Sequence, residues 1–117
     1  MKVNRVISDI AVDDLDAARE FYAGFLGLSR EEFNLGWVAR FTSPGTGASV
    51  QVLTDDETGQ MNPVASVLVE DVDAAFAEAQ EQSIEIVHPL TREEWGVRRF
   101  FVRAPDGNVF NIVARPE

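Results

Sequence analysis

The sequence predicts an α+β protein built from two βαβββ modules, because three stretches occur twice in the same order. The pairs are residues 10–18 and 67–75, 30–33 and 92–95, and 41–45 and 102–106. The first pair, IAVDDLDAA and VLVEDVDAA, aligns at an offset of 57 residues, which brings Asp14 onto Asp71. We therefore predict a single domain, 1–117, that consists of two repeats, 1–57 and 62–117, each close to the size of a minimal folding unit.

Each copy opens with a short strand and a helix. Residues 6–12 and 64–69 are rich in β-branched side chains and predict strands. Asp14 and Asp71 follow them as N-caps, whose carboxylates accept hydrogen bonds from unpaired amides of the first helical turn. Asp16 and Asp73 add negative charge where the helix dipole is positive. The sequence thus predicts a helix directly after each N-cap.

Apolar residues at helical spacing define the sheet-facing side of both helices. In the first helix they are Leu15, Ala18, Phe21, Tyr22, Phe25 and Leu26. Gly27 ends this helix, and Tyr22 is interpreted as a core residue beside Phe21 and Phe25. In the second helix they are Val72, Ala75, Phe76 and Ala79.

Three further strands follow each helix. They are predicted over residues 28–33, 36–42 and 48–53 in the first copy, and over 84–88, 97–103 and 108–113 in the second. Residues 54–63 are polar and form the linker between the copies.

The last of these strands contains one polar side chain. Pro105-Asp106-Gly107-Asn108 predicts a turn, and the strand VFNIV follows it. Side chains alternate across a strand, so Phe110 and Ile112 share the helix-facing side while Asn111 lies on the opposite side. An amide in the middle of that face suggests a hydrogen-bonding role.

Composition limits the partners. Twenty acidic and ten basic residues give a net charge of −10, which disfavours nucleic acid and is compatible with a cationic ligand, although acidity also serves solubility. Without cysteine, disulfides, thiolate metal sites and cysteine nucleophiles are excluded. A single histidine, His88, excludes a multi-histidine metal site.

Nothing in the chain predicts association with a membrane. No apolar run approaches the length of a membrane span, and the stretch MKVNRVISDIAVDD has no signal-peptide pattern. We therefore expect a cytoplasmic location.

Two segments carry a family resemblance, DLDAAREFYAGFLGL (14–28) and WGVRRFFVRAPDGNVFNIV (95–113). With the duplicated βαβββ pattern, they resemble the vicinal oxygen chelate superfamily of glyoxalase I, bleomycin resistance proteins and extradiol dioxygenases. The resemblance implies paired modules in an open, U-shaped half-barrel with the helices outside. It also implies a ligand or metal in the cleft, and a homodimer.

The same resemblance identifies the positions that hold a metal in other members. They are Ile7, Gln51, Val64 and Asn111. Because two aliphatic side chains and two amides are poor ligands for divalent metals, we expect no metal and no cofactor. Gln51 and Asn111 would instead offer hydrogen bonds to a ligand, or Asn111 would bond Gln51 or a water.

Eight side chains are predicted to line the cleft: Asp9, Trp37, Gln51, Ser66, Trp95, Arg98, Arg99 and Asn111. The tryptophans would clamp a planar ligand, with core packing as the alternative. One of the adjacent arginines should point inward, where it would favour a carboxylate or phosphate, with surface solvation as the alternative. His88 could act as a general base, but a lone histidine without an identified partner is more often a surface or packing residue.

Three functions remain open. The first is a metal-independent small-molecule binding protein without catalytic residues, similar to members that sequester a cationic or aromatic antibiotic. The second is a glyoxalase-like lyase, isomerase or dioxygenase whose atypical metal site would use Asp9 or His88. The third is an interaction module with a vestigial cleft.

Overall fold

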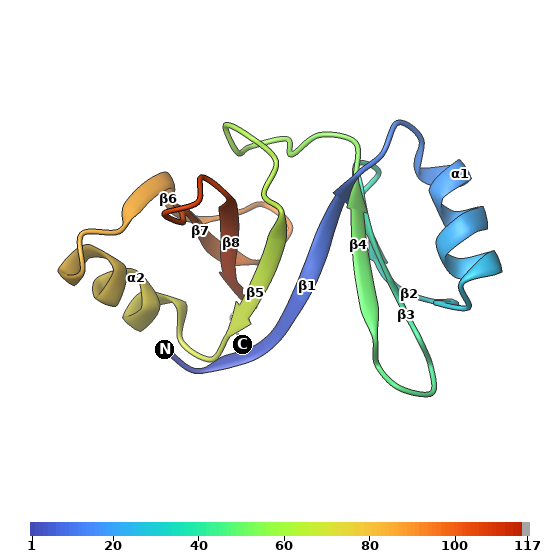
Figure 1. The fold of residues 1–117 in the computed structure, drawn as a ribbon, viewed down its shortest axis with the longest axis horizontal. Coiled ribbons are helices and arrows are strands. Elements are labelled where there is room, and N and C mark those ends of the chain that lie inside the picture. The colour runs from blue at the N-terminus through green and yellow to red at the C-terminus, as the bar shows by residue number, and fades with distance from the viewer. Residues whose placement is uncertain (116–117) are drawn as a thin grey trace. The chain divides into compact units, whose positions relative to one another are not determined.

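The computed structural model describes residues 1–115, which form two compact units (Figure 1). Residues 7–62 make up the N-terminal module, and residues 1–6 together with the chain from Pro63 onward make up the C-terminal module. Each module has the predicted βαβββ order, and the α+β class is confirmed. Within residues 1–115, no helix is both long and apolar enough to cross a membrane.

The N-terminal module has four strands in the order β2-β3-β4-β1. Their bounds are β1 Val3–Ala11, β2 Arg30–Asn34, β3 Val38–Thr42 and β4 Ser49–Leu53, and of β1 only residues 7–11 belong to this module. β1 runs parallel to β4, and the other neighbours are antiparallel. Helical segment α1 (Leu15–Arg19) begins at the predicted N-cap Asp14, whose side chain accepts hydrogen bonds from the amides of Asp16 and Ala17. The core between helix and sheet contains Ala18, Ala39, Phe41 and Val52.

The C-terminal module repeats this plan in the order β5-β8-β7-β6. Its elements are β5 Ala65–Val69, α2 Val72–Glu81, β6 Glu85–Arg92, β7 Arg98–Arg103 and β8 Val109–Ala114. The carboxylate of Asp71 caps α2 by accepting from the amide of Ala74 at 3.0 Å. Phe100 is fully buried beneath α2 and contacts Phe76 edge to face, with ring centroids 5.1 Å apart.

The first helix differs from the prediction in its second half. α1 continues as a π-helix, η1 (Glu20–Phe25), in which the amide of Leu26 bonds the carbonyl of Phe21. The extra residue in this turn rotates the following side chains away from the α-helical spacing. Tyr22 still packs against the core, but Phe21, Phe25 and Leu26 are 50%, 78% and 48% exposed, so the prediction that they lie on the sheet-facing side was wrong. Gly27 follows the helix with φ of 80°, as expected for its end.

The sixth strand is longer than predicted. We expected it to end before Pro89, but β6 continues to Arg92 with register shifts on both sides of His88. Proline is accommodated because β6 is an edge strand with irregular pairing. The last strand follows the prediction, because Ile112 lies in the core beneath α2 and Phe110 packs against that core. Alternation then places Asn111 on the other face of the sheet.

Candidate functional site

The face of the N-terminal sheet that carries no helix holds a chain of polar side chains. Arg40 lies between the core residues Ala39 and Phe41, and Gln51 precedes the core residue Val52, so both point away from the helix. Arg40 Nε donates to Gln51 Oε1 at 3.0 Å, and Gln51 Nε2 donates to Asp9 Oδ1 at 2.9 Å. The arginine can only donate and an ionised carboxylate can only accept. The orientation of the Gln51 amide is therefore fixed, with its oxygen toward Arg40 and its nitrogen toward Asp9.

The chain of hydrogen bonds continues toward the sheet edge. Arg40 Nη1 pairs with Glu32 Oε1 at 3.2 Å, and its guanidinium lies 4.8 Å from the ring centroid of Phe33. Thr42 Oγ1 donates to the other oxygen of Glu32 at 2.8 Å. The positive charge of Arg40 is therefore neutralised by a carboxylate within the same face.

The corresponding face of the C-terminal sheet contains the predicted pair Ser66 and Asn111. These two residues are register partners on β5 and β8, and both are buried. Asn111 Nδ2 donates to Ser66 Oγ at 3.0 Å, whereas Asn111 Oδ1 is buried without a hydrogen-bond partner in this structure. A buried acceptor left unpaired is costly, so this oxygen is suited to accept a hydrogen bond from a bound molecule or a water.

Three buried ionisable groups meet farther along the same face. Glu93 follows β6, and its Oε2 lies 2.6 Å from Arg99 Nε and 3.1 Å from His88 Nε2. The exposed fractions of Glu93, Arg99 and His88 are 5%, 3% and 7%. Because an ionised carboxylate only accepts hydrogen bonds, His88 must carry its proton on Nε2. His88 is thus buried rather than on the surface, and Glu93 is its partner.

Aromatic rings surround the guanidinium of Arg99. Its carbon lies 5.1 Å from the ring of Trp95 and 4.7 Å from the ring of Phe101, distances at which cations are attracted to ring faces. Trp95 is partly buried and lies in the turn between β6 and β7, three residues before β7 begins. The predicted residues Trp95, Arg99, Ser66 and Asn111 therefore belong to one face of one module.

Arg98 lies on the opposite face of β7. It forms a bidentate ion pair with Asp73 of α2, at 2.8 Å from Nη2 and 3.2 Å from Nε. Of the two adjacent arginines, only Arg99 points to the helix-free face, so Arg98 does not join the other predicted site residues. Trp37 immediately precedes β3 and is partly buried, and its carbonyl accepts from the amide of Thr54.

The Arg98–Asp73 pair predicts a pH dependence of stability. Hydrogen bonds from Arg98 hold the pKa of Asp73 below its ordinary value, and those to Asp73 raise the pKa of Arg98. A depressed carboxyl pKa stabilises the fold above the unfolded-state pKa, and this stabilisation is lost as the pH falls through the folded-state pKa. We expect Asp73→Asn to lower the melting temperature slightly at pH 7, and we expect this difference to shrink as the pH falls below the ordinary aspartate pKa of about 3.9. A difference between wild type and variant that persists unchanged at low pH would contradict this origin.

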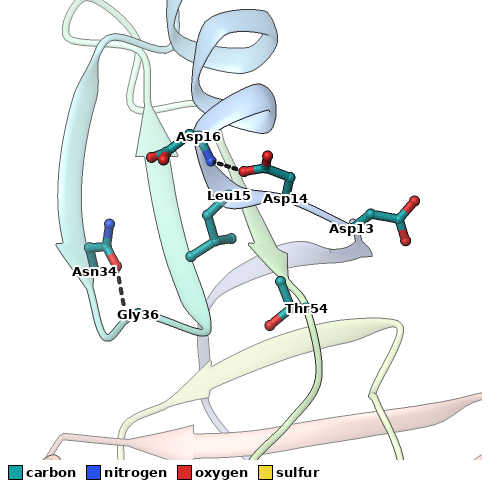
Figure 2. A pocket seen from close by; sticks show the side chains of 7 residues that line it. All are labelled: Asp13, Asp14, Leu15, Asp16, Asn34, Gly36 and Thr54. Carbon is teal, nitrogen blue, oxygen red and sulfur yellow. Dashed lines mark hydrogen bonds between the residues drawn. The ribbon is translucent and has the colours of Figure 1, made fainter.

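A surface cavity of about 420 Å³ lies elsewhere in the N-terminal module (Figure 2). It is lined by Asp13, Asp14, Leu15, Asp16, Asn34, Gly36 and Thr54. Asp14 is occupied with capping, Asp16 pairs with Arg19, and Asn34 accepts from the amide of Gly36 at 2.7 Å. None of the eight predicted site residues lines this cavity.

Sequence reasoning missed Glu93, Glu32 and Arg40. Glu32 and Glu93 lie in the duplicated segments 30–33 and 92–95, each of which reads Arg-Glu-Glu followed by an aromatic residue. In both modules, a glutamate and the aromatic residue of this segment contact an arginine of the helix-free face. The repeated Arg-Glu-Glu-aromatic motif is the signal in the sequence that points to these residues.

The residues at the four metal-binding positions of the resembled family do not fit a metal. Ile7 and Val64 have no donor atom, Gln51 is held between Asp9 and Arg40, and Asn111 is bonded to Ser66. Across residues 1–115, no group of three or more histidine, cysteine, aspartate or glutamate side chains is arranged to hold a metal ion. Amides alone are weak ligands for divalent first-row metals.

Comparison with known proteins agrees with this architecture. A structure named as NAD-dependent benzaldehyde dehydrogenase from Legionella pneumophila is similar over 96% of this chain and 100% of its own, with a TM-score of 0.78 and 20% identity. A glyoxalase/bleomycin resistance protein/dioxygenase superfamily member from Vibrio splendidus has a TM-score of 0.69 and 17% identity, over 96% of this chain and 98% of its own.

A methylmalonyl-CoA epimerase from Mycobacterium tuberculosis is 25% identical over 99% of this chain and 89% of its own, with a TM-score of 0.67. No curated protein matches the sequence. The family profile described as Glyoxalase/Bleomycin resistance protein/Dioxygenase superfamily matches residues 2–112. The duplicated βαβββ modules and this match over nearly the whole chain show that the protein belongs to the glyoxalase/bleomycin resistance protein/dioxygenase superfamily.

Proposed function

We propose that this protein is a metal-independent binding protein for a small planar molecule that is neutral or cationic, such as an aromatic antibiotic. The observation that supports this proposal best is the state of the two amides at the family's metal positions. Gln51 and Asn111 are both buried and hydrogen-bonded to neighbouring side chains, so they are held in place as neutral hydrogen-bonding groups.

The charge of the helix-free faces supports a neutral or cationic ligand. Arg40 and Arg99 are each paired with a glutamate, and each guanidinium also lies against an aromatic ring. An arginine that already has a carboxylate partner attracts a second anion weakly. The carboxylate of Asp9 adds negative charge to the N-terminal face. The expectation that an inward arginine selects a carboxylate or phosphate ligand therefore has little support.

An enzyme with an atypical metal site is the weaker alternative. Such a site would need Asp9 or His88 as a ligand, but Asp9 accepts a hydrogen bond from Gln51 and His88 bonds Glu93. Neither residue has two further metal-binding side chains around it in the part of the chain that the structure describes. A binding protein needs no catalytic residue, so we assign none.

Thermal shift with defined probes tests the proposal. The protein is heated in EDTA, with Mg²⁺, Mn²⁺, Ni²⁺ or Zn²⁺, with bleomycin or acridine orange as cationic aromatic probes, and with acetate or pyruvate as anions. A ligand at a hundred times its dissociation constant adds about 2.7 kcal/mol, which raises the melting temperature of such a domain by roughly 10 °C. We expect this rise with a cationic aromatic probe, unchanged by EDTA.

Matched variants test whether the rise in melting temperature depends on the side-chain amides of Gln51 and Asn111. Asn111→Ala and Gln51→Ala should reduce the shift relative to each variant's own melting temperature, whereas Gln60→Ala, at an exposed linker position, should leave it unchanged. A shift that requires a divalent metal, or one caused only by the small carboxylates, would refute the proposal.

A further inference from the structure

The π-helix of the N-terminal module presents an apolar patch to solvent. The patch consists of Phe21, Phe25 and Leu26, which are 50%, 78% and 48% exposed. The rings of Phe21 and Phe25 are stacked with their centroids 5.6 Å apart, and Phe21 also contacts Tyr22 edge to face at 5.0 Å. Contiguous exposed aromatic residues of this kind mark interaction sites in soluble proteins more often than chance exposure.

The duplication supplies an internal control for this patch. At the offset of 57 residues that aligns Asp14 with Asp71, Phe21 corresponds to Glu78 and Phe25 to Gln82. If the additional residue of the π-helix is allowed for, Phe25 corresponds to Glu81 instead, which is also polar. The same helix position in the same βαβββ plan is therefore compatible with polar side chains. The fold does not require the aromatic residues, so their presence calls for a separate reason.

The negative charge around the patch indicates which kind of partner would bind there. The N-terminal module contains ten acidic and three basic side chains, a net charge of −7. Asp13, Asp14, Asp16 and Glu20 are exposed on or just before the helical segment that carries the patch. The pKa of Arg19, the single base of this segment, is raised by its hydrogen bonds to Glu31 and Asp16, so it stays charged and paired. An apolar patch beside unbalanced carboxylates is complementary to a surface with apolar anchors and positive charge.

We infer that the Phe21–Phe25–Leu26 patch docks a basic amphipathic helix of a partner protein. The partner's apolar side chains pack on the two stacked rings, and its lysines or arginines face the carboxylates of residues 13–20. A second copy of this chain fits less well, because joining two copies through this face brings two modules of charge −7 together. The inference does not depend on the proposed small-molecule ligand, which concerns the helix-free faces.

Binding of a synthetic peptide tests the inference. The probe is a fluorescein-labelled 18-residue helix of leucine and lysine with all leucines on one face, and the control peptide has serine in place of leucine. Fluorescence anisotropy at 0.15 M salt should show at least tenfold tighter binding of the leucine peptide. Phe25→Ser should weaken that binding at least fivefold without loss of fold, because this side chain is largely exposed.

Two further variants make the test specific. Gln82→Ser, at the C-cap of α2 and 57 residues after Phe25, should bind the peptide like the wild type. Glu20→Gln should weaken binding at low salt and have less effect at high salt. Equal affinity for the leucine and serine peptides would overturn the inference. So would a wild-type dimer in sedimentation velocity that Phe25→Ser converts to a monomer, because the patch would then belong to a second copy.

Discussion

Replacing Glu93 by glutamine is expected to destabilise the protein by about 3–5 kcal/mol, because the change removes a carboxylate charge that pairs with a buried guanidinium. Arg99 is 3% exposed and lies 2.6 Å from the carboxylate, so solvent cannot replace the lost partner. Domains of this size are stable by about 5–15 kcal/mol in total. Thermal or urea unfolding of Glu93→Gln should therefore show a melting temperature lower by at least roughly 10 °C.

A double-mutant cycle separates the ion pair from the packing. Arg99→Met removes the buried positive charge and keeps much of the volume between Trp95 and Phe101. The double variant Glu93→Gln/Arg99→Met should be clearly more stable than Glu93→Gln alone, since neither charge then remains buried without a partner. If the losses of unfolding free energy in the two single variants add up to the loss in the double variant, Glu93 and Arg99 do not stabilise each other, and the prediction is wrong.

The second large effect is expected in the core. Phe100→Ala should destabilise the protein by about 3–5 kcal/mol, because Phe100 of β7 is fully buried in the core beneath α2 and its loss leaves a cavity. The matched control is Phe25→Ala, the same chemical change at a ring that is 78% exposed, which should alter the unfolding free energy by no more than about 0.5 kcal/mol.

Urea unfolding measures both variants under the same conditions, and an unchanged slope with denaturant shows that the comparison concerns stability alone. A large loss in Phe25→Ala would mean that this ring packs against the protein, and it would also weaken the docking inference. A small loss in Phe100→Ala would contradict the core described beneath α2.

The helices, the caps and the strand alternation could be predicted from the sequence because they depend on residues a few positions apart. Asp14 and Asp71 cap their helices through amides two or three residues away, as expected. The side chain of Asn111 points to the face of the sheet away from that of its neighbour Ile112, because side-chain direction alternates within any strand. The prediction that Ile7, Gln51, Val64 and Asn111 stand at the positions where related proteins hold a metal likewise came from the sequence.

Only the tertiary structure decided which side chains pair, because those contacts depend on strand register and on turns between strands. Glu93, in the turn after β6, pairs with Arg99 of β7 and His88 of β6. Arg98 pairs with Asp73 because α2 packs on that face of the sheet. The exposure of Phe21 and Phe25 depends on one extra residue in a helical turn, which the apolar spacing does not reveal. Local patterns thus determined the elements and the side of the last strand on which Asn111 lies, whereas register and helix geometry determined the buried charge cluster and the exposed patch.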